Sequence, residues 1–133
     1  MTAANRNIVI EAGSTWNDVI TWKTGTPAAA VNLSGYTARM QIRATRTAAT
    51  SIIDITPTLG GAAGTITCTL TAVQTAALDF TGAPEGYVVT TDSLGVATTT
   101  TGKCAVYDLE LINGATVTRL AQGIVCLSPE VTR

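Results

Sequence analysis

The chain has 133 residues, of which 46% are hydrophobic and 13% are charged, and its formal net charge is −1. This length favours one domain with a real core, and its eight scattered lysines and arginines do not form the cationic cluster that binds nucleic-acid phosphates. Histidine is absent, which excludes Ser-His-Asp and Cys-His catalysis, histidine metal sites and imidazole pH switching.

The chain begins without a targeting pattern. Residues 1–7 have no cationic start followed by an apolar stretch, so we expect no signal peptide and synthesis in the cytoplasm. The longest apolar runs are far shorter than the roughly 20 residues of a membrane helix, so we expect no membrane partner. About a fifth of the residues are threonine, which favours β structure. The low charge also indicates that neighbouring subunits cover part of the surface.

Two short strands are predicted near the N-terminus, over residues 7–11 and 16–23. The second strand places Trp16 and Trp22 on one face, which we expect to look inward. Asp18 shares that face, and we expect it at a strand end or a bulge rather than in an active site.

The clearest alternation in the chain covers residues 36–43. Its predicted inward side chains are Tyr36, Ala38, Met40 and Ile42. The opposite face carries Arg39 and Arg43, and Arg46 follows shortly after them. These three arginines form either a small anion-binding or subunit-docking patch or an ordinary solvated strand edge, where cations discourage edge-to-edge pairing. We favour the solvated edge.

A glycine-rich turn follows a strand that is predicted over residues 52–56. Residues 60–64 do not form a phosphate loop, because no Lys-Ser or Lys-Thr follows and the next element is a predicted strand. That strand covers residues 65–71 and has three inward side chains, Ile66, Cys68 and Leu70. Thr71 is the predicted N-cap of a short helix over residues 72–78.

Residues 81–103 are predicted to be an insertion, either an extra hairpin or a loop. In the hairpin, residues 86–91 pair with residues 95–99 across a short turn. The insertion contains a threonine run of low complexity, Thr98, Thr99, Thr100 and Thr101. This run is either a mobile loop or an arm that orders against a neighbouring subunit, which makes it a candidate interface.

A β-hairpin is predicted near the C-terminus, where residues 105–112 and 115–127 flank Asn113-Gly114. Asn-Gly favours a type I′ turn, because it tolerates φ > 0 at both central positions. The side chains expected on the inward face are Tyr107, Leu109 and Leu111. Those expected on the outward face are Val106, Asp108, Glu110 and Ile112.

Together these elements amount to seven to nine short antiparallel strands with one short helix. They predict an all-β fold, an immunoglobulin-like β-sandwich that forms a single domain over residues 1–133. The Cys-Trp-Cys arrangement of true immunoglobulin domains is absent, so the likeness concerns architecture alone.

The three cysteines, Cys68, Cys104 and Cys126, have no spacing typical of zinc ligands. The favoured interpretation is three buried thiols that act as small hydrophobic side chains. Two alternatives remain open: a disulfide between subunits, or one internal disulfide that leaves a free thiol.

Several segments carry a resemblance to a known family. They are Thr15-Trp16 leading to Trp22, residues 33–43, 64–71, 75–78 and 107–111, and the closing residues 128–133. The chain resembles a family of small tailed-phage and prophage proteins that is similar to the N-terminal sandwich domain of baseplate upper proteins. It departs from that pattern in its longer excursion over residues 80–103 and in cysteine at positions 68 and 126, where Thr or Val is expected.

The resemblance implies a structural role in the virion, with other phage structural proteins and copies of the same chain as partners. The first hypothesis is an adaptor in the tail, baseplate or neck region that anchors fibres or neighbouring subunits. An alternative in the same class is a capsid decoration (cement) protein. An alternative of another class is a carbohydrate-binding module, suggested by the two tryptophans and three tyrosines, although inward tryptophans favour a core role.

We expect no enzymatic activity and no small-molecule substrate, and we assign no catalytic residue, cofactor or metal. No two carboxylates have a spacing that demands a shared site. Asp108 and Glu110 lie on one outward strand face and could bind a divalent ion, but solvated charge is the favoured interpretation.

Overall fold

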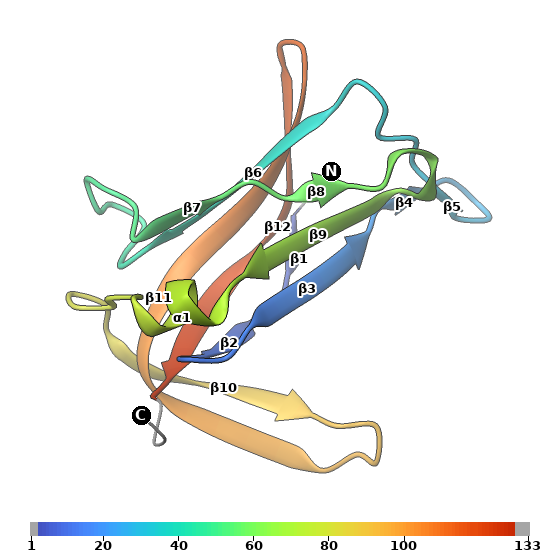
Figure 1. Ribbon diagram of the computed structural model, residues 1–133. Coiled ribbons are helices and arrows are strands. Elements are labelled where there is room, and N and C mark those ends of the chain that lie inside the picture. The colour runs from blue at the N-terminus through green and yellow to red at the C-terminus, as the bar shows by residue number, and fades with distance from the viewer. Residues whose placement is uncertain (1–2, 130–133) are drawn as a thin grey trace.

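The computed structural model describes residues 3–129 of the chain (Figure 1), so residues 130–133 of the closing segment lie outside the described residues. Between residues 3 and 129 the chain forms twelve β-strands, one α-helix and one 3₁₀-helix. A seven-stranded sheet packs against a three-stranded sheet, with the core between them. The predicted all-β sandwich is confirmed.

The larger sheet has the order β1-β12-β11-β6-β7, with β2 beside β12 and β10 beside β11. Its strands are β1 (Ala4–Asn5), β2 (Ile8–Glu11), β6 (Thr37–Arg43), β7 (Ile53–Ile55), β10 (Glu85–Thr91), β11 (Ala97–Asn113) and β12 (Thr116–Ser128). The smaller sheet has the order β3-β9-β8, with β3 (Trp16–Thr21), β8 (Thr58–Leu59) and β9 (Thr65–Leu70). A separate ribbon joins β4 (Lys23–Thr24) and β5 (Ala29–Ala30).

The strands differ from the prediction in number, length and direction. There are twelve rather than seven to nine, and β11 and β12 are 17 and 13 residues long. Two pairings are parallel, β1 with β12 and β2 with β12. Four strands of two residues each were not predicted, because two residues are too few to display an alternation.

The predicted inward faces form the core. The buried side chains that alternation identified are Ala38, Met40, Ile42, Ile66, Cys68, Leu70, Tyr107, Leu109 and Leu111. Trp22 is also buried and packs edge-to-face on Tyr36, with ring centroids 5.8 Å apart, and half-buried Trp16 packs on the same core. Both tryptophans therefore belong to the core, as their inward parity predicted.

The α-helix α1 (Ala72–Ala76) begins at the predicted cap. The Thr71 hydroxyl accepts a hydrogen bond from the Gln74 N–H at 3.2 Å, and the Gln74 side chain accepts one from the Thr71 N–H at 2.9 Å. Buried Thr75 donates to the Ser14 carbonyl at 2.8 Å, which fixes the helix to the turn between β2 and β3. The described helices include none that is long and apolar enough to cross a membrane.

The glycine cluster before β9 serves a close crossing of the chain. A 3₁₀-helix η1 (Gly61–Ala63) is followed by Gly64, whose φ is 69°. A Cβ at Gly64 would lie 2.9 Å from the carbonyl oxygens of Trp22 and Val31, so a side chain has no room there. This packing accounts for the glycine without any phosphate.

The turn of the C-terminal hairpin differs from the predicted type. Asn113 pairs with Thr116, and Gly114 occupies the first central position with φ of 60°. Since no other residue type between residues 3 and 129 has a positive φ, the turn fits type II′ rather than type I′. A bulge near Leu109 turns both Leu120 and Ala121 toward the core.

Candidate interaction surfaces

One hairpin stands away from the sandwich, at the bottom of Figure 1. We call residues 85–103 the arm: β10 pairs with the first seven residues of β11 in an antiparallel register from Glu85–Lys103 to Thr91–Ala97. The Asp92 carboxylate closes the tip by accepting the N–H groups of Leu94 and Val96 at 2.9 Å each. The threonine run over residues 98–101 therefore lies in a paired strand of this hairpin.

The two faces of the arm differ in what they meet. The inner face packs Val88 against Cys104, and its threonines, Thr90, Thr98 and Thr100, line a hollow beside β2 and β3. The outer face is uncharged between its ends and carries Tyr87, Val89, Thr91, Ala97, Thr99 and Thr101.

Large apolar side chains are exposed along the arm. Tyr87 is 65% exposed and Val89 is 52% exposed, and at the tip the values are 87% for Leu94 and 57% for Val96. A two-stranded ribbon has little core of its own, so these side chains gain burial only against another molecule. A cluster of exposed apolar groups is typical of an interaction site.

A disulfide lies at the base of the arm. It joins Cys104 of β11 to Cys126 of β12, with Cα atoms 4.1 Å apart, and both residues pack with Val88 and Val9 in a small second cluster. The structure thus has the arrangement of one internal disulfide and one free thiol, rather than three thiols. The free thiol is Cys68, and burial raises its pKa to about 11.

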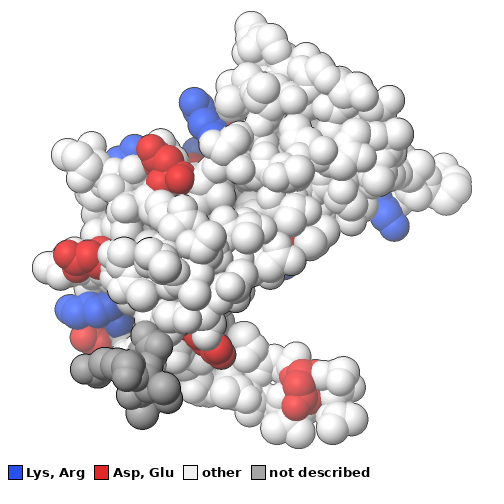
Figure 2. Space-filling model, in the orientation of Figure 1, with Lys and Arg blue, Asp and Glu red and all other residues white. Residues whose placement is uncertain are grey.

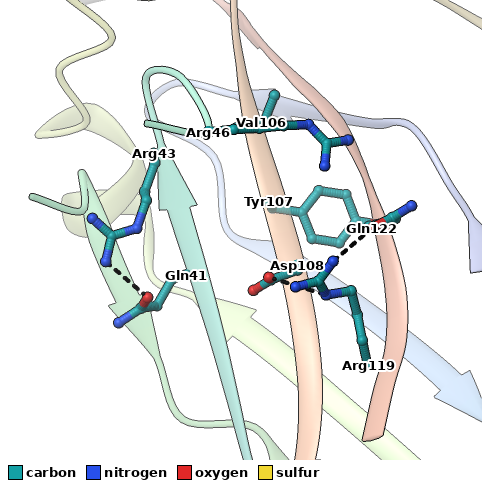
Figure 3. A pocket seen from close by; sticks show the side chains of 8 residues that line it. All are labelled: Gln41, Arg43, Arg46, Val106, Tyr107, Asp108, Arg119 and Gln122. Carbon is teal, nitrogen blue, oxygen red and sulfur yellow. Dashed lines mark hydrogen bonds and ion pairs between the residues drawn. The ribbon is translucent and has the colours of Figure 1, made fainter. Parts of the chain in front are cut away.

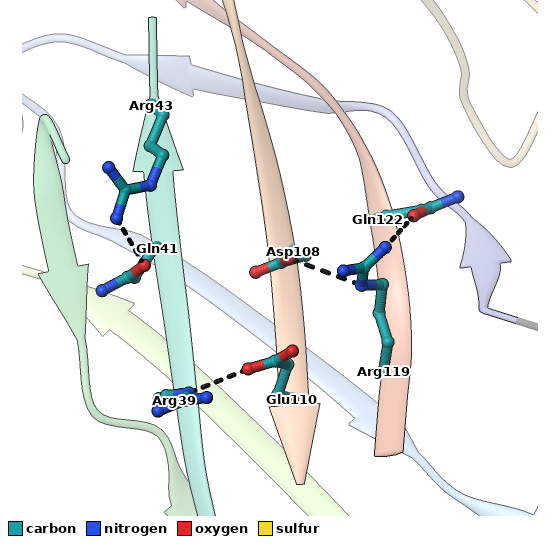
Figure 4. Close-up of polar contacts among 7 residues, drawn as sticks. All are labelled: Arg39, Gln41, Arg43, Asp108, Glu110, Arg119 and Gln122. Atoms are coloured by element: carbon teal, nitrogen blue, oxygen red, sulfur yellow. Dashed lines mark hydrogen bonds and ion pairs between the residues drawn. The ribbon is translucent and has the colours of Figure 1, made fainter. Parts of the chain in front are cut away.

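The three predicted arginines do not share one environment; Figure 4 shows two of them, Arg39 and Arg43. Arg39 donates to the Glu110 carboxylate at 2.8 Å, which neutralises it. Arg43 donates to the Ala48 carbonyl at 3.0 Å and to the Gln41 side chain at 3.1 Å. The strand-edge interpretation is wrong, because β6 lies inside the sheet between β11 and β7.

Arg43 and Arg46 instead line a hollow of about 170 Å³ on the outer face of the larger sheet (Figure 3). Arg46 extends past Val106 in this view. Arg119 of β12 lines the same hollow and pairs with Asp108 at 3.4 Å. Sequence reasoning missed Arg119. The other arginines of the hollow, Arg43 and Arg46, lie far from it along the chain, and only the pairing of β12 with β11 and of β11 with β6 brings them to one place.

Asp18 lies in the middle of β3 rather than at a strand end or bulge. Arg6 donates to both of its carboxylate oxygens, at 2.8 and 3.2 Å. This hydrogen bond is the main reason why the pKa of Arg6 is raised. The Tyr107 hydroxyl donates to the Arg6 carbonyl at 2.7 Å, and burial raises the pKa of Tyr107 to about 12. Arg6 therefore connects β3 of one layer to β11 of the other.

Gly123 permits this connection. A Cβ at Gly123 would lie 2.2 Å from the Arg6 carbonyl oxygen, so any side chain would displace the N-terminal segment from β12. The Arg6 N–H donates to the Gln122 carbonyl at 2.9 Å, which holds the segment in place.

The described carboxylates show no arrangement suited to a metal ion. Between residues 3 and 129, no group of three or more Cys, Asp or Glu residues could hold one. Asp108 and Glu110 share the outward face of β11, as predicted, and each pairs with an arginine of a neighbouring strand.

No protein-family model matches the chain, and no curated protein matches it at a significant level.

Proposed function

We propose that the chain is a bacteriophage virion structural protein, an adaptor in the tail, baseplate or neck region that anchors fibres or neighbouring subunits. The sequence resemblance to small tailed-phage proteins suggests the virion. The arm suggests the mode of action, since it extends a sheet beyond the sandwich and offers apolar groups to a neighbour.

The exposed apolar side chains on the outer face and at the tip of the arm carry this proposal. Burying one large apolar side chain contributes about 1.5–3 kcal/mol. Tyr87, Val89, Leu94 and Val96 are all more than half exposed. Burying these side chains at a subunit contact would contribute several kcal/mol to the free energy of association, and a monomer gains none of it.

The distribution of charge also supports assembly. Figure 2 displays a broad white area over the upper right of the molecule, and the arm carries charge only near its base and its tip. Four of the described cations are paired with carboxylates, those of Arg6, Arg39, Lys103 and Arg119. Surfaces of low charge lose little hydration when subunits pack on them.

A capsid decoration protein is the alternative within the same class, because an arm that grips a neighbour suits a capsid joint equally well. A carbohydrate-binding module is less favoured. The tryptophans that suggested it pack in the core, and the exposed aromatic ring of the arm is Tyr87 alone.

The test is to locate and count the chain in phage particles. Particles purified from the lysate of the bacterium that carries the gene are labelled with a gold-conjugated antibody against this chain, and its copy number is measured by quantitative mass spectrometry. An adaptor gives label at the tail or neck and about six to eighteen copies, whereas a decoration protein gives label over the shell and hundreds of copies. Absence from purified particles, with the chain abundant in the soluble lysate, would overturn the proposal.

A further inference from the structure

We propose that the outer edge of β10 pairs in antiparallel fashion with the β10 edge of a second copy of the chain, forming a four-stranded sheet from two arms. This inference names a partner for the arm and rests on the proposed function only in treating the arm as an assembly surface. It is carried by the direction of the backbone groups along β10.

Hydrogen bonds at the two ends of the arm fix which residues of β10 face β11. The Cys104 N–H donates to the Pro84 carbonyl at 2.9 Å, and the Asp92 N–H donates to the Val96 carbonyl at 3.0 Å. Hydrogen-bonded and non-hydrogen-bonded pairs alternate along an antiparallel ladder. Counting from either end, the non-hydrogen-bonded residues of β10 are Glu85, Tyr87, Val89 and Thr91.

The N–H and C=O groups of these residues therefore point away from β11. Among residues 3–129, β10 pairs with no other strand, so the edge meets no backbone partner of its own chain. Cys104 directs its N–H to Pro84 while it lies opposite Cys126, so β10 and β12 flank opposite edges of β11. The free edge of β10 therefore faces away from both β11 and β12.

This edge lacks the features that keep other edges from pairing. Edges of soluble proteins are commonly short, or carry charges, proline or bulges. The edge strand β3 has the inward charge of Asp18, and β7 has three residues with Asp54 at its centre. By contrast, β10 has seven residues, and from Gly86 to Thr91 it contains no charge and no proline.

A second copy fits this edge better than a charged strand does. Centring the pair on Val89 brings Val89 opposite Val89 of the second copy and Tyr87 opposite its Thr91. This register uses the outward groups of all three residues in both copies. In this register Glu85 lies opposite Ser93 of the second copy and Asp92 lies opposite its Gly86, so no like charges face each other. Glu85 also pairs with Lys103 of its own arm at 3.6 Å. A charged partner strand would have no opposite charge to pair with along residues 86–91 of β10.

The contact is small. Tyr87 and Val89 are exposed by 65% and 52%, so pairing buries on the order of 300 Å² per copy, below the ~800 Å² per partner of a standard interface. The arms therefore pair weakly in dilute solution and strongly where several copies are held together. The twofold symmetry makes the interface self-complementary.

Cross-linking through one introduced cysteine at a time tests the edge and its register, because the native free thiol, Cys68, is buried. In the proposed sheet, Val89 lies about 5.5 Å from its counterpart. Thr99, which faces Val89 across the arm, lies three strand spacings from its own counterpart, about 14 Å. At roughly 0.5 mM protein, a reagent that spans about 5 Å should link Val89→Cys into dimers and leave Thr99→Cys, the matched control, monomeric. Equal linking, or linking of Thr99→Cys alone, would place the contact elsewhere.

Proline variants supply a second measurement. Val89→Pro removes an outward N–H but none of the bonds within the arm, so it should abolish self-association in sedimentation equilibrium while the melting temperature is retained. Thr99→Pro, the matched control on the other edge, should self-associate as the unmodified chain does. If neither cysteine variant forms dimers, pairing with a second copy is wrong. The adaptor role would survive that result, provided that the chain is still found in particles.

Discussion

At the scale of single residues, Asp18 was the one inward charge that the sequence marked as unusual. Alternation alone could place it on the inner face of a strand, but not identify its partner. Arg6 precedes it in a segment without a recognisable pattern, and the pair forms only because Gly123 lets that segment lie against β12. The charge is half-buried and held by two hydrogen bonds, so it links the layers rather than forming a reactive site.

Removing this pair should destabilise the sandwich. Asp18→Asn leaves the Arg6 guanidinium without its counterion in a half-buried position, so we expect a loss of about 1–2 kcal/mol, between the values for exposed and buried pairs. The midpoint of urea unfolding measures it. Asp54→Asn, at an exposed position of β7, is the control and should change stability by less than about 0.5 kcal/mol. Equal effects of both substitutions would contradict this assignment.

Two buried acids make stability depend on alkaline pH. Burial raises the pKa of Cys68 from 9.0 to about 11 and that of Tyr107 from 10.0 to about 12. Both groups lose their protons in the unfolded chain first, so their contribution is complete below pH 9 and is lost as pH rises toward 12. The free energy of unfolding should fall by about 3 kcal/mol per group across that window. Cys68→Ala should flatten the fall that begins near pH 9, and an unchanged profile would count against the burial.

At the scale of elements, alternation predicted what it can detect. Strands of six or more residues with one buried face were found, as was α1, because Thr71 and Gln74 form its capping box. The parallel pairings of β1 and β2 with β12 were not found, since they join opposite ends of the chain. The sequence predicted that the arm is a hairpin or a loop. It did not predict the free edge, because that edge depends on the register between β10 and β11, which a run of identical threonines does not specify.

Shortening the arm should separate assembly from folding. Replacing residues 89–99 by Asn-Gly joins Val88 to Thr100, an opposed pair, and keeps the cluster at the base. The removed side chains lie mostly outside the core, so the free energy of unfolding should change by less than about 1 kcal/mol. The shortened chain should be absent from particles when it competes with the full chain. Incorporation at equal levels would show that another surface makes the contact.

At the scale of the whole molecule, the fold followed from strand periodicity, whereas the function did not. A sandwich scaffold hosts many functions, so function must be argued from surfaces. The surfaces here depend on long-range register. Arg43 and Arg119 line one hollow because β11 pairs with both β6 and β12, and Cys104 is bonded to Cys126 across the β11–β12 hairpin. Sequence reasoning named Arg43, Cys104 and Cys126 as candidates and missed Arg119. Which of these residues are neighbours is decided only by the strand register.

The disulfide makes the stability of the chain depend on the redox state of its compartment. It closes a loop of 22 residues, and constraining the unfolded chain in this way contributes about 3 kcal/mol. The chain is therefore expected to be less stable in the reducing cytoplasm than outside the cell. Urea unfolding with and without dithiothreitol measures the difference, and Cys104→Ala with Cys126→Ala should remove all sensitivity to the reductant.

Because Val88 packs on this disulfide, the arm should lose hydrogen-exchange protection before the sandwich does. An arm that stays protected after reduction would mean that the disulfide does not hold its base.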